Sequence, residues 1–115
     1  MHELFNDILS IEGVKGVMLF SFSGDLLFRE MGSALPPDAE KISWSRFLGS
    51  LEGMRETDLV FEKGRIYIRR TDIGFLVILT GLFVSMAILR LNCDILLPSL
   101  KPMKSSKRWG RFFKR

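Results

Sequence analysis

The sequence contains one histidine, one cysteine and no phosphate-binding loop, and each shortage removes a class of chemistry. His2 and Cys93 cannot by themselves supply the four ligands of a structural zinc site. No glycine-rich segment is followed by the Lys-Ser/Thr pair that holds nucleotide phosphates. A single cysteine also favours a reducing compartment. We therefore expect a cytoplasmic protein that is not an enzyme, with no catalytic residue, cofactor, metal or small-molecule substrate.

The charge is unevenly distributed along the chain. There are 17 Lys and Arg residues against 13 Asp and Glu residues, a net charge of +4. Residues 101–115 contain seven of the basic residues and no acid, so removing them leaves ten basic against thirteen acidic residues, a net charge of −3. We therefore divide the chain into an acidic domain, residues 1–100, and a basic tail, residues 101–115.

The segment TDLVFEKGRIYIRR predicts a β-hairpin. Two strands, Thr57 to Glu62 and Arg65 to Arg70, flank Lys63-Gly64, and glycine suits a tight turn because it accepts positive φ. The resulting register pairs Glu62 with Arg65, Phe61 with Ile66, Val60 with Tyr67, Leu59 with Ile68 and Asp58 with Arg69. Apolar residues then face apolar residues, and both acids face arginines.

The next segment, Ile73 to Leu79, is apolar without alternation, which indicates a central strand covered on both faces. The alternating strand before it is better suited to the periphery, so we expect a sheet edge at Leu59 to Phe61. The uncharged run from Ile73 to Leu89 would span about 26 Å as a helix, short of the ~30 Å core of a bilayer. Because Gly74 and Gly81 interrupt this run, a strand followed by a packed helix is favoured over a transmembrane helix.

Two helices and a hairpin are predicted before this meander, and one helix after it. The first helix covers Glu3 to Ile11, and the hairpin strands are Val17 to Phe22 and Asp25 to Glu30. The second helix begins near Pro36 and reaches about Met54, and the last covers Phe83 to Leu97. The order α-β-β-α-β-β-β-α indicates an α+β sandwich.

The second helix carries an apolar stripe broader than one sheet contact requires. Its members are Ile42, Trp44, Phe47, Leu48, Leu51 and Met54. An unpaired edge strand beside such a helix favours aggregation unless it is covered, and two-fold pairing covers both at once. The predicted homodimer interface is Trp44, Leu48, Leu51, Leu59, Val60 and Phe61. An alternative is that the whole stripe is core.

The last helix is apolar over most of its surface, so we expect it to be heavily buried. Arg90 and Asp94 are spaced to form an i,i+4 ion pair on it. Buried with the helix, Cys93 is expected to serve as a small apolar side chain.

Two segments resemble the roadblock/dynein light chain family, and the likeness in order and spacing covers residues 3–100. ILSIEGVKGVMLFSFSGDLL is similar to the opening of that family, with a helix, a Gly-Val-x-Gly step, a strand and a turn. LVFEKGRIYIRRTDIGFLVIL is similar to its central meander. The short Thr80-Gly81-Leu82 loop and the basic tail depart from the family pattern.

The resemblance implies a roadblock/profilin-like five-stranded antiparallel sheet of order 2-1-5-4-3 with helices on both faces. It also implies a homodimer with joined sheet edges and adjacent middle helices, which binds or regulates a Ras-like small GTPase or scaffolds a complex. On that helix we assign partner binding to Ile42, Arg46 and Phe47.

The tail supports a function of another class, binding of a membrane surface or nucleic acid by a chain that the domain dimerises. Its basic and aromatic residues are Lys101, Lys104, Lys107, Arg108, Trp109, Arg111, Phe112, Phe113, Lys114 and Arg115. Such a composition suits an anionic membrane, at about 1 kcal/mol per basic residue, or phosphates and stacked bases. A solvated tail without a ligand, and a small-molecule sensor in a pocket of the sheet, are further alternatives.

Overall fold

The chain forms one antiparallel sheet of five strands in the order β2-β1-β5-β4-β3. The computed structural model describes residues 2–31, 44–50 and 53–100. The strands are β1 (Val14–Ser21), β2 (Leu26–Met31), β3 (Glu56–Val60), β4 (Arg65–Arg70) and β5 (Gly74–Thr80). The predicted sheet order is confirmed. The apolar segment is the central strand, since every residue of β5 is buried.

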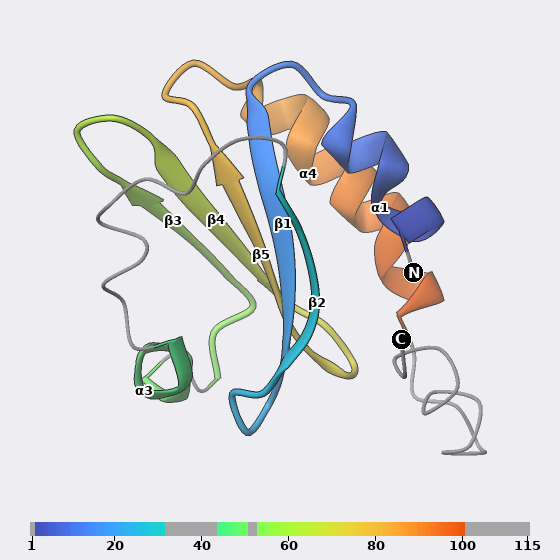
Figure 1. The fold of residues 1–115 in the computed structure, drawn as a ribbon, viewed down its shortest axis with the longest axis vertical. Coiled ribbons are helices and arrows are strands. Elements are labelled where there is room, and N and C mark those ends of the chain that lie inside the picture. Colours follow the sequence, from blue (N-terminus) through green and yellow to red (C-terminus); the bar gives the residue numbers. More distant parts are fainter. Residues whose placement is uncertain (1, 32–43, 51–52, 101–115) are drawn as a thin grey trace.

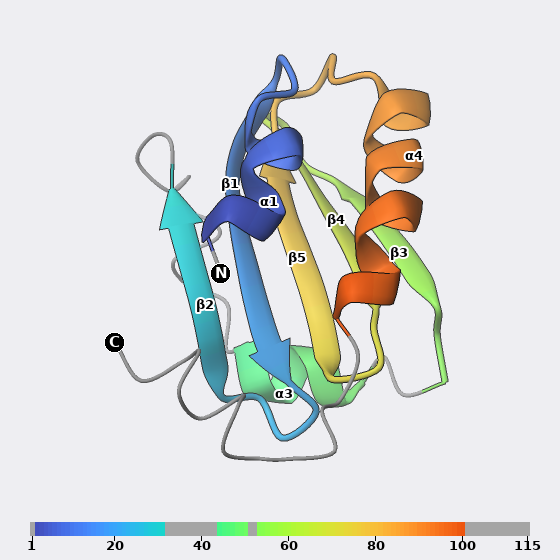
Figure 2. The ribbon, with the colours of Figure 1, turned by 90° about the vertical axis from the view of Figure 1, so that its right-hand side faces the viewer.

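Helices cover both faces of the sheet, as predicted (Figure 1). The helices are α1 (His2–Leu9), α3 (Trp44–Gly49) and α4 (Met86–Leu96), and the 3₁₀ turn η1 (Leu97–Ser99) follows α4. Figure 2 shows α1 and α4 side by side on one face and α3 behind the sheet. Within residues 2–31, 44–50 and 53–100, no helix is both long and apolar enough to cross a membrane.

Alternating strand residues divide the core into two clusters. On the α1/α4 face, Phe5 and Ile8 of α1 and Leu89 of α4 pack with inward residues of the sheet such as Leu76 and Tyr67. The other cluster contains Leu48 of α3 with Met18, Phe20, Ile66, Ile68, Phe75, Val77 and Leu79. The sheet is therefore covered on both faces, which explains the continuous apolar sequence of its central strand.

The predicted register between β3 and β4 is wrong by two residues. Glu56, not Asp58, lies opposite Arg69, and Leu59 lies opposite Ile66. The amide of Phe61 donates to the carbonyl of Gly64 (2.8 Å), so the turn is centred one residue earlier than predicted. A shift of two keeps every side chain on its predicted face, which is why the apolar pattern did not reveal it.

The same turn shows why Gly64 is required. Its φ is not positive, since the positive-φ glycines are Gly13, Gly24, Gly53 and Gly74. A Cβ on Gly64 would lie 2.7 Å from the carbonyl oxygen of Thr80. The glycine therefore permits close approach of the turn to β5 rather than an unusual backbone conformation.

Two predicted helices differ from the structure. α3 ends at Gly49, and Met54 lies outside any helix, whereas residues 32–43 and 51–52 lie outside the described part of the chain. α4 begins at Met86, where the Ser85 hydroxyl accepts from the Ile88 amide (3.4 Å). The prediction that this last helix is heavily buried is wrong, because only its inner residues Leu89, Cys93 and Leu96 are buried.

Candidate interaction surface at the sheet edge

β3 is an edge strand whose outer backbone groups have no neighbouring strand among the described residues. The carbonyl of Arg55 accepts from Arg70 (2.8 Å), and the amide of Phe61 donates to Gly64. Odd-numbered residues of this strand therefore direct their backbone groups toward β4. Alternation leaves the backbone N–H and C=O of Asp58 and Val60 directed outward, where a further strand can pair with them.

The side chains along this edge are partly apolar and partly charged. Val60 is 63% exposed and Phe61 is 36% exposed, whereas Leu59 is half-buried against the α3-side cluster. Asp58 accepts a hydrogen bond from Nε of Arg65 (3.3 Å), its diagonal neighbour on β4. Val60 and Phe61 are thus the predicted interface residues of this strand that remain accessible in the single chain.

The helix residues predicted to meet a partner divide into three groups. Leu48 is 1% exposed and belongs to the core, so its side chain cannot form a surface in the single chain. Phe47 is half-buried against the same core cluster, and Arg46 is exposed. The side chain of Trp44 and the whole of Ile42 and Leu51 lie outside the described part of the structure.

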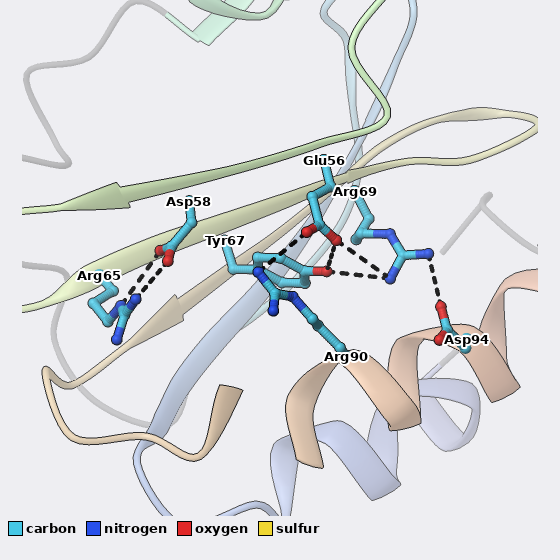
Figure 3. A network of polar contacts seen from close by, with 7 residues as sticks. All are labelled: Glu56, Asp58, Arg65, Tyr67, Arg69, Arg90 and Asp94. Atoms are coloured by element: carbon cyan, nitrogen blue, oxygen red, sulfur yellow. Dashed lines mark hydrogen bonds and ion pairs between the residues drawn. The ribbon is translucent and has the colours of Figure 1, made fainter. Parts of the chain in front are cut away.

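A polar network joins β3, β4 and α4 on the face of the sheet that α1 and α4 cover, opposite α3 (Figure 3). The Tyr67 hydroxyl donates to Oε2 of Glu56 (2.7 Å) and accepts from Nη1 of Arg69 (3.1 Å). Arg69 also binds Asp94 of α4 (2.8 Å), and Arg90 of α4 binds Oε1 of Glu56 (3.2 Å). The predicted pairing of Arg90 with Asp94 is therefore wrong, since each binds a strand residue instead.

This network positions α4 and is a poor acid–base site. Tyr67 is fully buried, and its hydroxyl has two partners, so no polar group of the ring is left unsatisfied. Burial raises the pKa of Tyr67 to about 12, and the hydrogen bond to Glu56 adds to the rise. Because the phenol is buried and its hydroxyl is already bound to Glu56 and Arg69, a substrate has no access to its proton. The sequence signal for this network was the presence of Glu56 and Tyr67 on two paired strands. The predicted register placed Val60 opposite Tyr67 and so concealed the network.

The Tyr67 phenol in the folded protein is expected to titrate near pH 12, against about pH 10 in the unfolded chain. Its contribution to stability is complete below pH 10 and is lost as the pH rises toward 12, by about 2–3 kcal/mol. Because Tyr67 is the only tyrosine, phenolate absorbance in native and denaturing buffer reports on it alone.

A native midpoint near pH 10 would contradict the network. Tyr67→Phe is the control for the pH dependence of the free energy of unfolding. It removes the phenol, so a loss of stability that this variant still shows above pH 10 comes from other groups, such as the lysines and Cys93. Burial raises the pKa of the Cys93 thiol to about 12 as well, in keeping with its predicted role as a small apolar side chain.

Comparison with solved structures identifies this architecture as the roadblock/LC7 fold. A roadblock/LC7 domain from Streptomyces avermitilis superposes with a TM-score of 0.68 at 15% identity, over 87% of this chain and 93% of that chain. Myxococcus xanthus MglB gives 0.64 at 16% identity, over 85% of each chain. An MglB with a tetrameric arrangement gives 0.62 at 17% identity, over 85% of this chain and 82% of that chain. The sequence matches no protein-family model and no curated protein.

Proposed function

We propose that this chain is a non-enzymatic, homodimeric roadblock-type module that binds or regulates a Ras-like small GTPase or scaffolds a complex. The observation that carries the proposal is the outer edge of β3, which directs the backbone groups of Asp58 and Val60 away from the sheet. Two such edges related by a two-fold axis would form one continuous sheet. One structure with the same fold is an MglB with a tetrameric arrangement, which supports the proposal.

The GTPase is proposed from the resemblance of the sequence to roadblock proteins. We propose α3 as the centre of the surface for this role, because the resemblance to roadblock proteins implies a dimer with joined sheet edges and adjacent middle helices. Arg46 is the exposed residue of the predicted partner-binding set, whereas Phe47 is half-buried against the core. Arginine is enriched among residues that dominate binding energies.

Arg46→Ala is expected to weaken binding of a GTP-analogue-loaded Ras-like GTPase from the same organism by about tenfold, or about 1.4 kcal/mol. Isothermal titration of the full chain with the GTPase in its GTP-analogue and GDP forms measures this. Affinity that depends on the nucleotide and persists in ~0.5 M salt would distinguish protein recognition from tail-driven attraction of phosphate.

Arg29→Ala is the matched control, because Arg29 is also an exposed arginine but lies on β2 at the other edge of the sheet. Its affinity should equal that of the wild type. Equal weakening by both variants would indicate a general charge effect, and no weakening by Arg46→Ala would place the GTPase surface elsewhere.

A further inference from the structure

Figure 2 shows no described element over the outer face of α4, and this face carries exposed apolar side chains. Ile88, Leu91 and Ile95 are spaced i, i+3 and i+7 and lie on one side of the helix. They are 50%, 58% and 66% exposed, and Phe83 in the preceding loop is 98% exposed. We call these four residues the α4 stripe.

The polar network holds α4 in a rotation that directs the stripe toward solvent. Asp94 and Arg90 bind residues of β4 and β3, while Leu89 and Cys93 are buried against the sheet. Rotation of the helix to bury the stripe would break these ion pairs and expose the core side. The stripe is therefore a stable property of the folded chain.

A shallow groove extends the apolar surface beyond the first turn of the helix. It has a volume of about 420 Å³ and lies between the α1–β1 loop and the start of α4. Ile11, Leu82, Phe83 and Ile88 are among its lining residues, with Glu12 as its charged member. The stripe and this groove together present aliphatic and aromatic groups along the length of the helix.

The basic tail starts at the opposite end of this helix. Leu100 is fully buried, which fixes the point where residues 101–115 leave the domain. Trp109 is nine residues further on, a reach of up to about 30 Å, whereas Ile88 to Ile95 covers about 10 Å of helix. The seven basic residues and three aromatic residues of the tail can therefore meet the same flat surface as the stripe.

We propose that the α4 stripe and the basic tail together bind an anionic lipid membrane. The tail supplies the positive charge, and the stripe supplies apolar side chains that enter the lipid, the two signals that stable peripheral binding needs. Of the acids close to this surface, Glu56 and Asp94 are each paired with an arginine, so they repel anionic lipids less than free carboxylates would, and Glu12 lies in the groove. This surface lies on the other layer from α3, so the proposal does not rest on the GTPase.

The aliphatic character of the stripe favours lipid over nucleic acid. Nucleic acids are held by cations and by aromatic or guanidinium stacking, and isoleucine and leucine side chains offer neither. A second copy of the chain would cover the stripe, but its acidic domain has a net charge of only −3 to set against the seven basic residues of the tail. A lipid surface satisfies both.

Leu91→Glu/Ile95→Glu in the full chain tests the stripe, because both side chains are exposed and their replacement should not unfold the domain. Co-sedimentation with phosphatidylcholine vesicles that do or do not contain phosphatidylserine measures partitioning. The wild type should prefer the anionic vesicles, and the double variant should bind them at least about tenfold more weakly. Arg108→Glu/Arg111→Glu in the tail should have an effect of at least the same size.

Leu26→Glu is the matched control, because Leu26 is 50% exposed but lies on β2, away from α4. Its vesicle binding should equal that of the wild type. Unchanged binding by either double variant overturns the proposal, as does a wild type that ignores anionic vesicles but binds duplex DNA or RNA. Self-association of the stripe variant is also measured without lipid. If this variant no longer self-associates but binds vesicles like the wild type, the stripe contacts a second copy of the chain and not a membrane.

Discussion

Gly74→Ala is expected to lower the free energy of unfolding by about 4 kcal/mol, a large part of the stability of a domain of this size. Gly74 begins β5, and a Cβ there would lie 1.8 Å from the carbonyl oxygen of Phe20 on β1. Its φ of 157° also belongs to a region that residues with a Cβ rarely adopt. Overpacking and backbone strain each cost about 1–3 kcal/mol.

The turn before β5 cannot move to relieve this clash without losing hydrogen bonds. The Thr71 hydroxyl accepts from the Gly74 amide (3.0 Å) and donates to the Gly74 carbonyl (2.9 Å). The backbone of Phe20 is held in turn by the pairing of β1 with β5. Urea unfolding at a fixed protein concentration measures the loss, since self-association makes apparent stability depend on concentration.

Gly49→Ala is the control substitution, because the Cβ that it would add at the end of α3 has no described atom within 4 Å apart from its chain neighbours and the backbone of its own helix. Its effect should stay within about 1 kcal/mol, in the direction set by helix propensity. If Gly74→Ala and Gly49→Ala unfold at similar urea concentrations, β1 and β5 are not in close contact at this end of the sheet.

The central part of the fold could be predicted because burial determines which residue types a strand contains. A strand covered on both faces needs an apolar side chain at every position, which Ile73 to Leu79 shows. The edge strand alternates because only one of its faces meets a full core, and Leu59 faces that core. The resemblance to roadblock proteins then supplied the order of the strands.

The turn centre could not be predicted because long-range contacts decide it. Lys63-Gly64 resembles a turn that needs positive φ, but Gly64 is placed by its approach to Thr80, sixteen residues further along the chain. The wrong centre paired Asp58 with Arg69 and so concealed the network of Glu56, Tyr67 and Arg69.

The candidate surfaces were harder to predict than the core, since sequence shows that a residue is apolar but not what covers it. Part of the stripe of the second helix was expected to meet a partner, and Leu48, which was assigned to that part, is core in the single chain. The last helix was expected to be core, yet Ile88, Leu91 and Ile95 are exposed. In both helices the rotation about the helix axis, set by contacts with the sheet, decides which apolar residues reach solvent.

Val60→Pro is expected to raise the dissociation constant of the proposed homodimer by about 5- to 150-fold and to leave the single chain folded. Proline removes the outward N–H of Val60, and the two-fold axis doubles the loss to about 1–3 kcal/mol. Among residues 2–31, 44–50 and 53–100 this N–H has no strand partner, because the neighbouring Phe61 amide is the one directed toward β4. Sedimentation velocity from nanomolar to micromolar concentration measures the dissociation constant.

Val60→Thr separates the backbone effect from that of the side chain. Threonine keeps the N–H and the β-branched shape, and Val60 is 63% exposed, so this variant should dimerise like the wild type. If Val60→Pro remains a dimer at the same concentrations, the chains associate through another surface, and the α4 stripe is then the next to test. A wild-type chain that is monomeric at micromolar concentration contradicts the homodimer itself, because two chains that pair through β3 should be associated at that concentration.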